Sequence, residues 1–156
     1  LQPEHAGLAT NVMCQANDIG AELATVSDVH AMTDVTGFGL AGHLLEMCQG
    51  AGLTAMLDGA SLPELEGLDN YIQAGCVPGG SQRNFDAYGE HLAPMDARLR
   101  TLVCDPQTSG GLLIAVAPAA TPAVQSLLKS RGLVDSVIGE LRPATQSGSI
   151  VNVSAA

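Results

Sequence analysis

The stretch Thr33-Asp34-Val35-Thr36-Gly37-Phe38-Gly39-Leu40 joins two contrasting patterns and sets the order of elements around it. Before it, residues 29–35 are predicted to be extended. Its glycines predict a tight turn. After it, apolar side chains recur at helical spacing and Gly52 supplies a stop signal. That helical stripe consists of Leu40, Leu44, Met47, Cys48 and Ala51.

Further apolar runs predict the remaining elements. Helices are expected over residues 3–16, 18–26 (capped by Asp18) and from Pro122 to the stop at Gly132 (capped by Thr121), with short helical turns near residues 61–64 and 68–74. Strands are expected over residues 53–57, 112–116, 137–141 and 150–153. The last two strands are expected to pair antiparallel across residues 144–149. Residues 79–88 show no assignable pattern, and residues 99–103 suit a helix or a strand.

Composition predicts one domain over residues 1–156 of the α/β or α+β class, and the predicted elements make a mixed β-sheet packed with several helices. Apolar residues make up 46% of the 156 residues, which is enough for a sizeable core. Aromatic residues are only 3%, so aliphatic side chains must build that core. The 18 glycines and eight prolines predict many tight turns, which a helical bundle would not need.

The charge is strongly acidic and unevenly distributed. Six Lys and Arg residues oppose 16 Asp and Glu, for a formal net charge of −10, and no Lys or Arg precedes Arg83. Such a surface repels phosphate backbones and anionic lipid, so we expect neither nucleic acid nor a membrane as partner. Any phosphate bound by the first half of the chain needs a metal ion or another domain to neutralise it.

The cysteines and the termini suggest a cytoplasmic fragment. Cys14, Cys48, Cys76 and Cys104 are too far apart for a zinc motif, and reduced thiols are the default in the cytosol. No apolar run approaches the roughly 20 residues of a membrane span, and no signal peptide is evident. The chain begins at Leu1 within a helical pattern, so we expect it to be part of a longer protein.

Asp34 is the first candidate for chemistry. A glycine turn before a helix favours anions, yet Asp34 is itself an anion and no P-loop lysine follows. A carboxylate beside bound phosphate makes sense if Mg²⁺ lies between them, since Mg²⁺ takes one or two carboxylates plus phosphate oxygens. The alternative is that Asp34 or Thr36 only caps the following helix.

Two further polar segments are candidates. Cys104-Asp105-Pro106-Gln107-Thr108-Ser109-Gly110-Gly111 either presents polar side chains to a ligand or only reverses the chain. Gly79-Gly80-Ser81-Gln82-Arg83-Asn84 holds an isolated cation that could bind a phosphate or pair with a surface acid. Cys104 has no neighbouring His in sequence and is not expected to be a nucleophile. We expect His43 to be buried or capping.

Taken together, these segments resemble the selenophosphate synthetases (selenide, water dikinases), in their carboxy-terminal domain. The likeness rests on three motifs in the family's order: residues 33–44, then Val77-Pro78-Gly79-Gly80 with Arg83-Asn84, then residues 104–113. It runs from about residue 3 to residue 153. The resemblance implies an α+β layer structure like the carboxy-terminal domain of the aminoimidazole ribonucleotide synthetase superfamily. It also implies the conversion of ATP, selenide and water into selenophosphate, AMP and phosphate.

By that resemblance, Asp34 is the Mg²⁺ ligand of this domain, and Thr36, Gly37 and Gly39 shape the turn at the ATP cleft. The reactive Cys or Sec, a nearby Lys and most metal-binding Asp residues would belong to an amino-terminal half that this chain lacks. The fragment is therefore expected to be inactive alone, to need that half as its partner, and to form a homodimer through it. Proximity to the cleft or to the missing domain is expected of Arg83, Asn84, Asp105, Thr108 and Ser109.

Two other interpretations remain open. The same domain could belong to another ATP-dependent synthetase or kinase of the superfamily, or it could be a non-catalytic interaction module. Residues 34–39 and the Thr-Ser-Gly-Gly run of residues 108–111 favour selenophosphate synthetase over the first alternative. An upstream half with a Cys or Sec near a Lys would eliminate the second.

Overall fold

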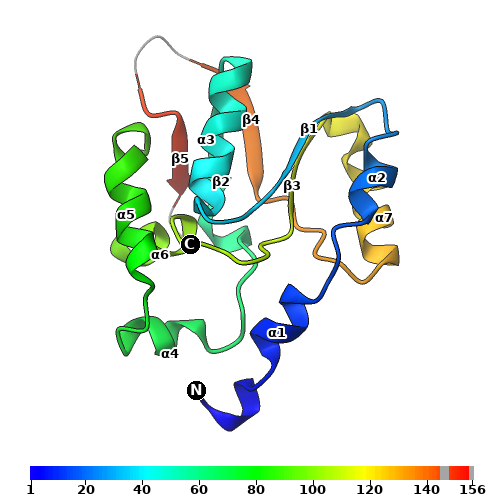
Figure 1. Ribbon diagram of the computed structural model, residues 1–156. Coiled ribbons are helices and arrows are strands. Elements are labelled where there is room, and N and C mark those ends of the chain that lie inside the picture. The colour runs from blue at the N-terminus through cyan, green and yellow to red at the C-terminus, as the bar shows by residue number, and fades with distance from the viewer. Residues whose placement is uncertain (145–147, 155–156) are drawn as a thin grey trace.

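The strands form two sheets in the computed structural model, which describes residues 1–144 and 148–154. β1 (Val29–Asp34) pairs antiparallel with β3 (Leu112–Val116). β2 (Leu53–Asp58) lies between β4 (Gly139–Pro143), which runs antiparallel to it, and β5 (Val151–Ser154), which runs parallel. Figure 1 shows the two sheets with their helices. The predicted α+β class with a mixed sheet is confirmed, and the strands are divided between two sheets.

The predicted pairing of the last two strands is wrong. β4 and β5 each hydrogen-bond to β2 and not to one another, giving the order β4-β2-β5. β2 carries the buried Ala55 and Leu57, whereas β4 has no buried residue, so the apolar strand takes the centre of the sheet. Residues 145–147 of the expected turn lie outside the described residues.

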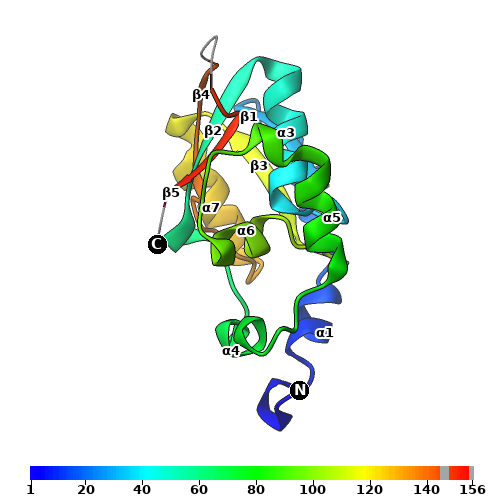
Figure 2. The ribbon, with the colours of Figure 1, turned by 90° about the vertical axis from the view of Figure 1, so that its left-hand side faces the viewer.

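α3 (Gly39–Ala51) covers one face of this three-stranded sheet, as its apolar stripe predicted. It ends at Gly52, which adopts the left-handed conformation with φ 66° that glycine allows without strain. Figure 2 shows α3 and α5 together on one side of the sheet. The first core cluster lies between these elements and includes Leu44, Leu45, Cys48, Ala55, Leu57, Tyr88, Val103 and Val151.

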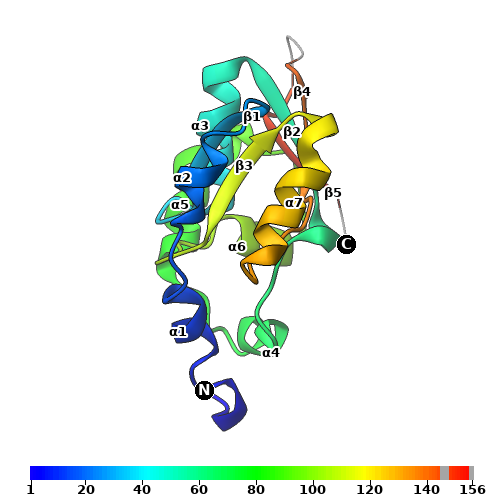
Figure 3. The same ribbon diagram turned by 90° about the vertical axis from the view of Figure 1, so that its right-hand side faces the viewer.

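A second, smaller core cluster covers the two-stranded sheet. α2 (Ile19–Leu23) and α7 (Thr121–Ser130) pack on β1 and β3 through the buried side chains Ile19, Leu23 and Val124 (Figure 3). Asp18 makes no side-chain cap to α2, and Thr121 is the first residue of α7 and not its cap.

The segments that the sequence left unassigned are helices. α5 (Gly79–Tyr88) buries a polar face of Ser81, Asn84 and Tyr88, which hides the usual apolar periodicity. α6 (Ala97–Val103) begins at Asp96, whose carboxylate accepts a hydrogen bond of 2.9 Å from the backbone N–H of Leu99. This cap resolves the choice between helix and strand at residues 99–103.

The amino-terminal helix is shorter than expected. The predicted helix over residues 3–16 is divided into a 3-10 turn (Pro3–His5) and α1 (Leu8–Met13), because Gly7 between them has φ 93°. This segment and α4 (Leu68–Gln73) lie away from both sheets (Figure 1). The phenol of Tyr71 on α4 connects them, since it accepts a hydrogen bond from Gln2 N and lies 2.8 Å from His5 Nδ1.

The remaining elements are short connections. Three further 3-10 turns span Gly59–Ser61, Gly89–His91 and Pro118–Ala120. Within the described residues, no helix has the length and apolar character that crossing a bilayer would require.

The packing of α3 on β2 predicts the effect of a core truncation. Leu44→Ala should lower the free energy of unfolding by about 2–5 kcal/mol, because Leu44 is 4% exposed within the first core cluster. Urea unfolding followed by circular dichroism measures this loss. The matched change Leu65→Ala, at a side chain that is 41% exposed, should cost much less. Equal losses at the two positions would contradict the placement of α3.

Candidate functional site

Backbone hydrogen bonds hold the turn of residues 34–39 directly against the loop of residues 104–111. The N–H of Val35 donates to Gly111 O, and the N–H of Gly110 donates to Val35 O, each at 2.9 Å. The N–H of Gln107 donates to Thr36 O at 3.1 Å. The pairing of β1 with β3 therefore continues past Asp34 and brings together two motifs separated by about 70 residues of sequence.

Asn84 joins the third motif to the other two. Its side-chain amide nitrogen donates to Gly37 O and to Cys104 O, both at 2.9 Å. The residue is buried on α5, with 9% of its surface exposed. One amide group thus satisfies a carbonyl from each of the two loops, and all three sequence motifs meet at one place.

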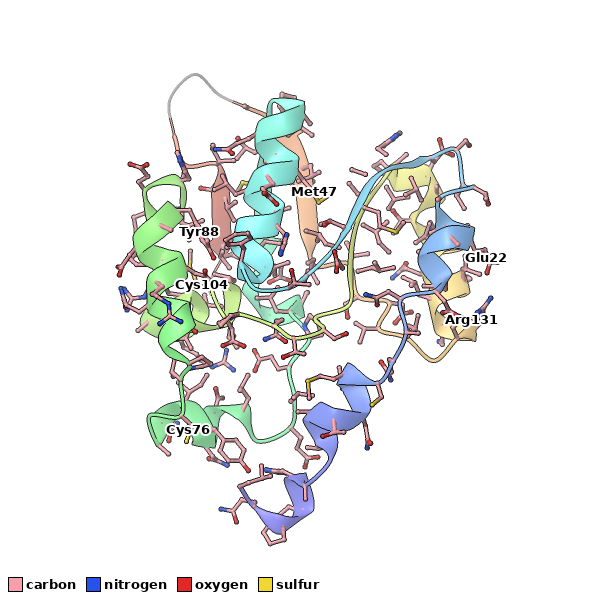
Figure 4. All side chains as sticks on the ribbon, in the orientation of Figure 1. Glu22, Met47, Cys76, Tyr88, Cys104 and Arg131 are labelled. Atoms are coloured by element: carbon pink, nitrogen blue, oxygen red, sulfur yellow. The ribbon has the colours of Figure 1, made fainter. Side chains whose placement is uncertain are left out.

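Tyr88 adds a second link that the sequence did not identify. Its hydroxyl donates to Phe38 O at 2.6 Å, and Figure 4 shows the ring between α5 and α3, beside Cys104. Burial raises the pKa of the Tyr88 phenol far above its ordinary value, so it remains a hydrogen-bond donor. The spacing of Ser81, Asn84 and Tyr88 on one helical face was the signal that could have revealed this residue.

Cys104 is fully buried. Desolvation raises the pKa of its thiol, although a hydrogen bond with Tyr88 and the charge of Arg100 oppose this shift. A raised pKa disfavours the reactive thiolate.

Two glycines are needed where backbones approach closely. A Cβ at Gly39, which has φ 69°, would lie 2.8 Å from Val103 O and 2.9 Å from Asp105 O. A Cβ at Gly110 would lie 2.8 Å from Val35 O. At the exposed Gly37, by contrast, a Cβ would meet no atom within 4 Å. Gly39 therefore serves the contact between the two loops, whereas the backbone of Gly37 is open to a ligand.

Asp34 is the last residue of β1, and its side chain is exposed. The residue that precedes α3 is Phe38, and no side chain caps that helix, so neither Asp34 nor Thr36 has the capping role considered above. Among the described residues, the Asp34 carboxylate takes part in no ion pair. It is thus available to a cation.

The described residues do not by themselves form a metal site. Across residues 1–144 and 148–154, no group of three or more His, Cys, Asp or Glu side chains is arranged to hold a metal ion. A single free carboxylate beside an open backbone turn nevertheless suits Mg²⁺, which completes its shell with water and phosphate oxygens. The Asp34 carboxylate is therefore a donor of the kind that Mg²⁺ binds.

Asp105 belongs to the loop of residues 104–111 and contacts α5. Its carboxylate accepts a hydrogen bond of 3.3 Å from Ser81 Oγ and another from the Gln107 amide. Burial raises the pKa of Asp105 above its ordinary value, although these two hydrogen bonds act in the opposite direction. Of the other predicted neighbours, Arg83 and Thr108 are exposed and Ser109 is half-buried.

His43 is buried near the start of α3, as expected, and its Nε2 lies 3.1 Å from Thr36 Oγ1. The sequence expectation did not connect these two residues. They are seven positions apart, and only the turn between β1 and α3 brings them into contact.

The position of Asn84 predicts a large effect from a one-atom change. Asn84→Asp removes the amide donor and turns a carboxylate toward two carbonyl oxygens, so the free energy of unfolding should fall by about 1–3 kcal/mol or more. Chemical denaturation measures this change. Asn70→Asp, at an exposed site on α4, is the matched control and should be nearly neutral. A neutral result at Asn84 would exclude its bridging role.

The raised pKa of Asp105 predicts a pH dependence. The folded state binds the proton of the Asp105 carboxyl group more tightly than the unfolded state does. Its contribution to stability is therefore fully present below pH 3.8, the ordinary pKa of Asp. That contribution is lost as the pH rises through the folded-state pKa. The free energy of unfolding of wild type minus that of Asp105→Asn should therefore decrease with pH and then level off. A difference that increases with pH would show that the two hydrogen bonds outweigh burial.

Comparison with known proteins shows a family likeness over almost the whole chain. Residues 2–152 match the family described as AIR synthase related protein, C-terminal domain. Selenide, water dikinase of Aeromonas hydrophila subsp. hydrophila is 54% identical over 145 residues, which is 93% of this chain and 42% of that protein. Selenide, water dikinase of Escherichia coli strain K12 is 52% identical over 153 residues, which is 98% of this chain and 44% of that protein.

The chain therefore spans less than half the length of these curated relatives. Among solved structures, Escherichia coli HypE aligns with 96% of this chain and 41% of its own, at a TM-score of 0.57 and 18% identity. At that identity the likeness concerns the fold alone.

Proposed function

The chain belongs to the family of AIR synthase related carboxy-terminal domains, and from that premise we propose that it is the carboxy-terminal part of an enzyme that makes selenophosphate. The reaction would convert ATP, selenide and water into selenophosphate, AMP and phosphate. Identities of 52–54% with selenide, water dikinases over more than nine-tenths of the chain support this reaction above others in the superfamily.

In this proposal, residues 1–156 form one domain of a longer, two-domain polypeptide. An amino-terminal half would bring the reactive Cys or Sec, a Lys and the other metal-binding Asp residues, and would form the homodimer. The 56–58% of each relative that this chain does not cover leaves room for such a half. The protein would act in the cytoplasm, and this chain would be inactive alone.

The meeting of three motifs beside Asp34 is the observation that carries the proposed role of this domain. Asn84 and the backbone bonds of Val35 and Thr36 hold the turn in one arrangement, so the exposed carboxylate of Asp34 projects from a rigid support. The sequence brings no Lys or Arg before Arg83 to neutralise phosphate. A divalent cation at Asp34 would offset the repulsion between the Asp34 carboxylate and a bound phosphate.

Each residue of the turn has a limited task in this scheme. Asp34 would hold Mg²⁺, which when bound neutralises the polyphosphate and stabilises the charge that develops during phosphoryl transfer. Gly37 would let the backbone approach ATP, since no atom lies within 4 Å of where its Cβ would be. Gly39 would keep the turn against residues 103–105, and Thr36 would line the cleft.

The test is selenide-dependent AMP formation by the complete reading frame that contains this chain, comparing wild type with Asp34→Asn. Asparagine keeps the shape of the side chain and removes its charge, so the rate should fall at least about 100-fold, and residual activity should need more Mg²⁺. Asp28→Asn, just before the other end of β1, is the control and should retain full activity.

The outcomes separate the reaction from the role of the residue. Full activity of Asp34→Asn, with folding intact by circular dichroism, would remove Asp34 from the metal site. Absence of selenide-dependent AMP formation by wild type would refute the proposed reaction and favour another ATP-dependent member of the superfamily.

A further inference from the structure

Thr36 is held at both its backbone and its side chain. Its carbonyl accepts hydrogen bonds from Gly39 N at 2.9 Å and from Gln107 N at 3.1 Å. Its Oγ1 lies 3.1 Å from His43 Nε2. A hydroxyl beside an imidazole nitrogen either donates or accepts, depending on which ring nitrogen carries the proton. The direction of this hydrogen bond decides whether the Thr36 hydroxyl can donate a hydrogen bond to a ligand or can only accept one.

The surroundings of His43 favour one tautomer. On its other side, Nδ1 lies 3.5 Å from Glu46 Oε2, one helical turn further along α3. A nearby carboxylate favours the proton on the nearer nitrogen, which is the tautomer with the proton on Nδ1 and the lone pair on Nε2. The Phe38 ring lies edge-on to the imidazole, with 5.9 Å between the two ring centroids, and helps to fix the plane of the imidazole. In that tautomer His43 Nε2 is an acceptor, and Thr36 donates its hydroxyl proton to it.

This direction leaves the lone pairs of Thr36 Oγ1 unused by His43. Val35, between Asp34 and Thr36, is buried and continues the pairing with Gly110 and Gly111, so this segment is extended. In an extended segment the side chains on either side of Val35 emerge on the same face. Two oxygen acceptors, one charged and one neutral, thus follow one another along the edge of the turn.

We propose that His43, oriented by Glu46, is a positioning residue that fixes Thr36 Oγ1 as an oxygen acceptor for the divalent cation or for a water molecule bound to it. Thr36 therefore serves the cation and not the phosphate, because its only proton is already given to His43. This inference rests on the proposed function and assigns to Thr36 and His43 a task that the resemblance left undefined.

The test is Mn²⁺ binding, measured by electron paramagnetic resonance on the full-length protein with a non-hydrolysable ATP analogue. Thr36→Val keeps the shape and removes the hydroxyl, and His43→Phe keeps a ring without nitrogen. Each should weaken Mn²⁺ binding about tenfold, the low end for groups that support a metal ligand. Thr36→Ser restores the hydroxyl and should bind Mn²⁺ within about twofold of wild type. Metal-free binding of the analogue should be unchanged in all three.

A matched pair isolates the role of the carboxylate. Glu46→Gln should weaken Mn²⁺ binding. Glu90→Gln should not, although Glu90 Oε1 lies 3.7 Å from Nε2 of the more exposed His91. Thermal unfolding of each variant accompanies the measurement. If His43→Phe does not fold, the comparison of Thr36→Val with Thr36→Ser still decides the question.

Two results would overturn the inference. If Thr36→Val leaves Mn²⁺ binding unchanged but weakens metal-free analogue binding, the hydroxyl donates to phosphate and the assigned tautomer is wrong. If Thr36→Val changes neither, Thr36 takes no part in binding. Asp34→Asn separates these results from failure of the proposed function: lost Mn²⁺ binding in Asp34→Asn with normal binding in Thr36→Val refutes only the role of Thr36.

Discussion

The amide of Asn84 and the backbone bonds beside it hold together parts of the chain that have no reason to meet in sequence. Asn84 donates to carbonyls of both loops, while Val35 and Thr36 share hydrogen bonds with residues 107–111. Buried carbonyls that lose their donors are costly, so this arrangement tolerates little displacement. The placement of Asp34, Thr36 and Gly37 depends on it.

The residues that hold the loops together are buried, whereas the charged candidate ligand is exposed. The groups that hold the loops together, such as Asn84, Tyr88 and Cys104, are buried, and burial keeps Tyr88 and Cys104 protonated. The exposed group is the carboxylate of Asp34. In the proposed function, an acidic domain that presents one free carboxylate from this turn would bind phosphate poorly by itself and would share a cation with the amino-terminal half.

Several elements of this fold were predictable because their signals are local. The stripe and glycine stop of α3, the apolar runs of β2 and β3, and the strand before Asp34 were all found from residue spacing alone. α5 was not found, because its inward face is polar and its partners are backbone carbonyls from distant loops. The contact of Tyr88 with the Phe38 carbonyl was missed for the same reason. The contact of His43 with Thr36 was missed because it depends on the conformation of the turn between β1 and α3.

The sequence by itself determined the acidic balance, the strand-turn-helix order around Asp34 and the three motifs that indicate the family. Only the tertiary structure decided that β4 and β5 flank β2, that the motifs meet through Asn84, and that Asp34 is exposed and does not cap α3. The physical reason is that periodicity and turn chemistry act between near neighbours. Strand order and polar contacts depend instead on which donors and acceptors, distant in sequence, can form hydrogen bonds with one another once the core is buried.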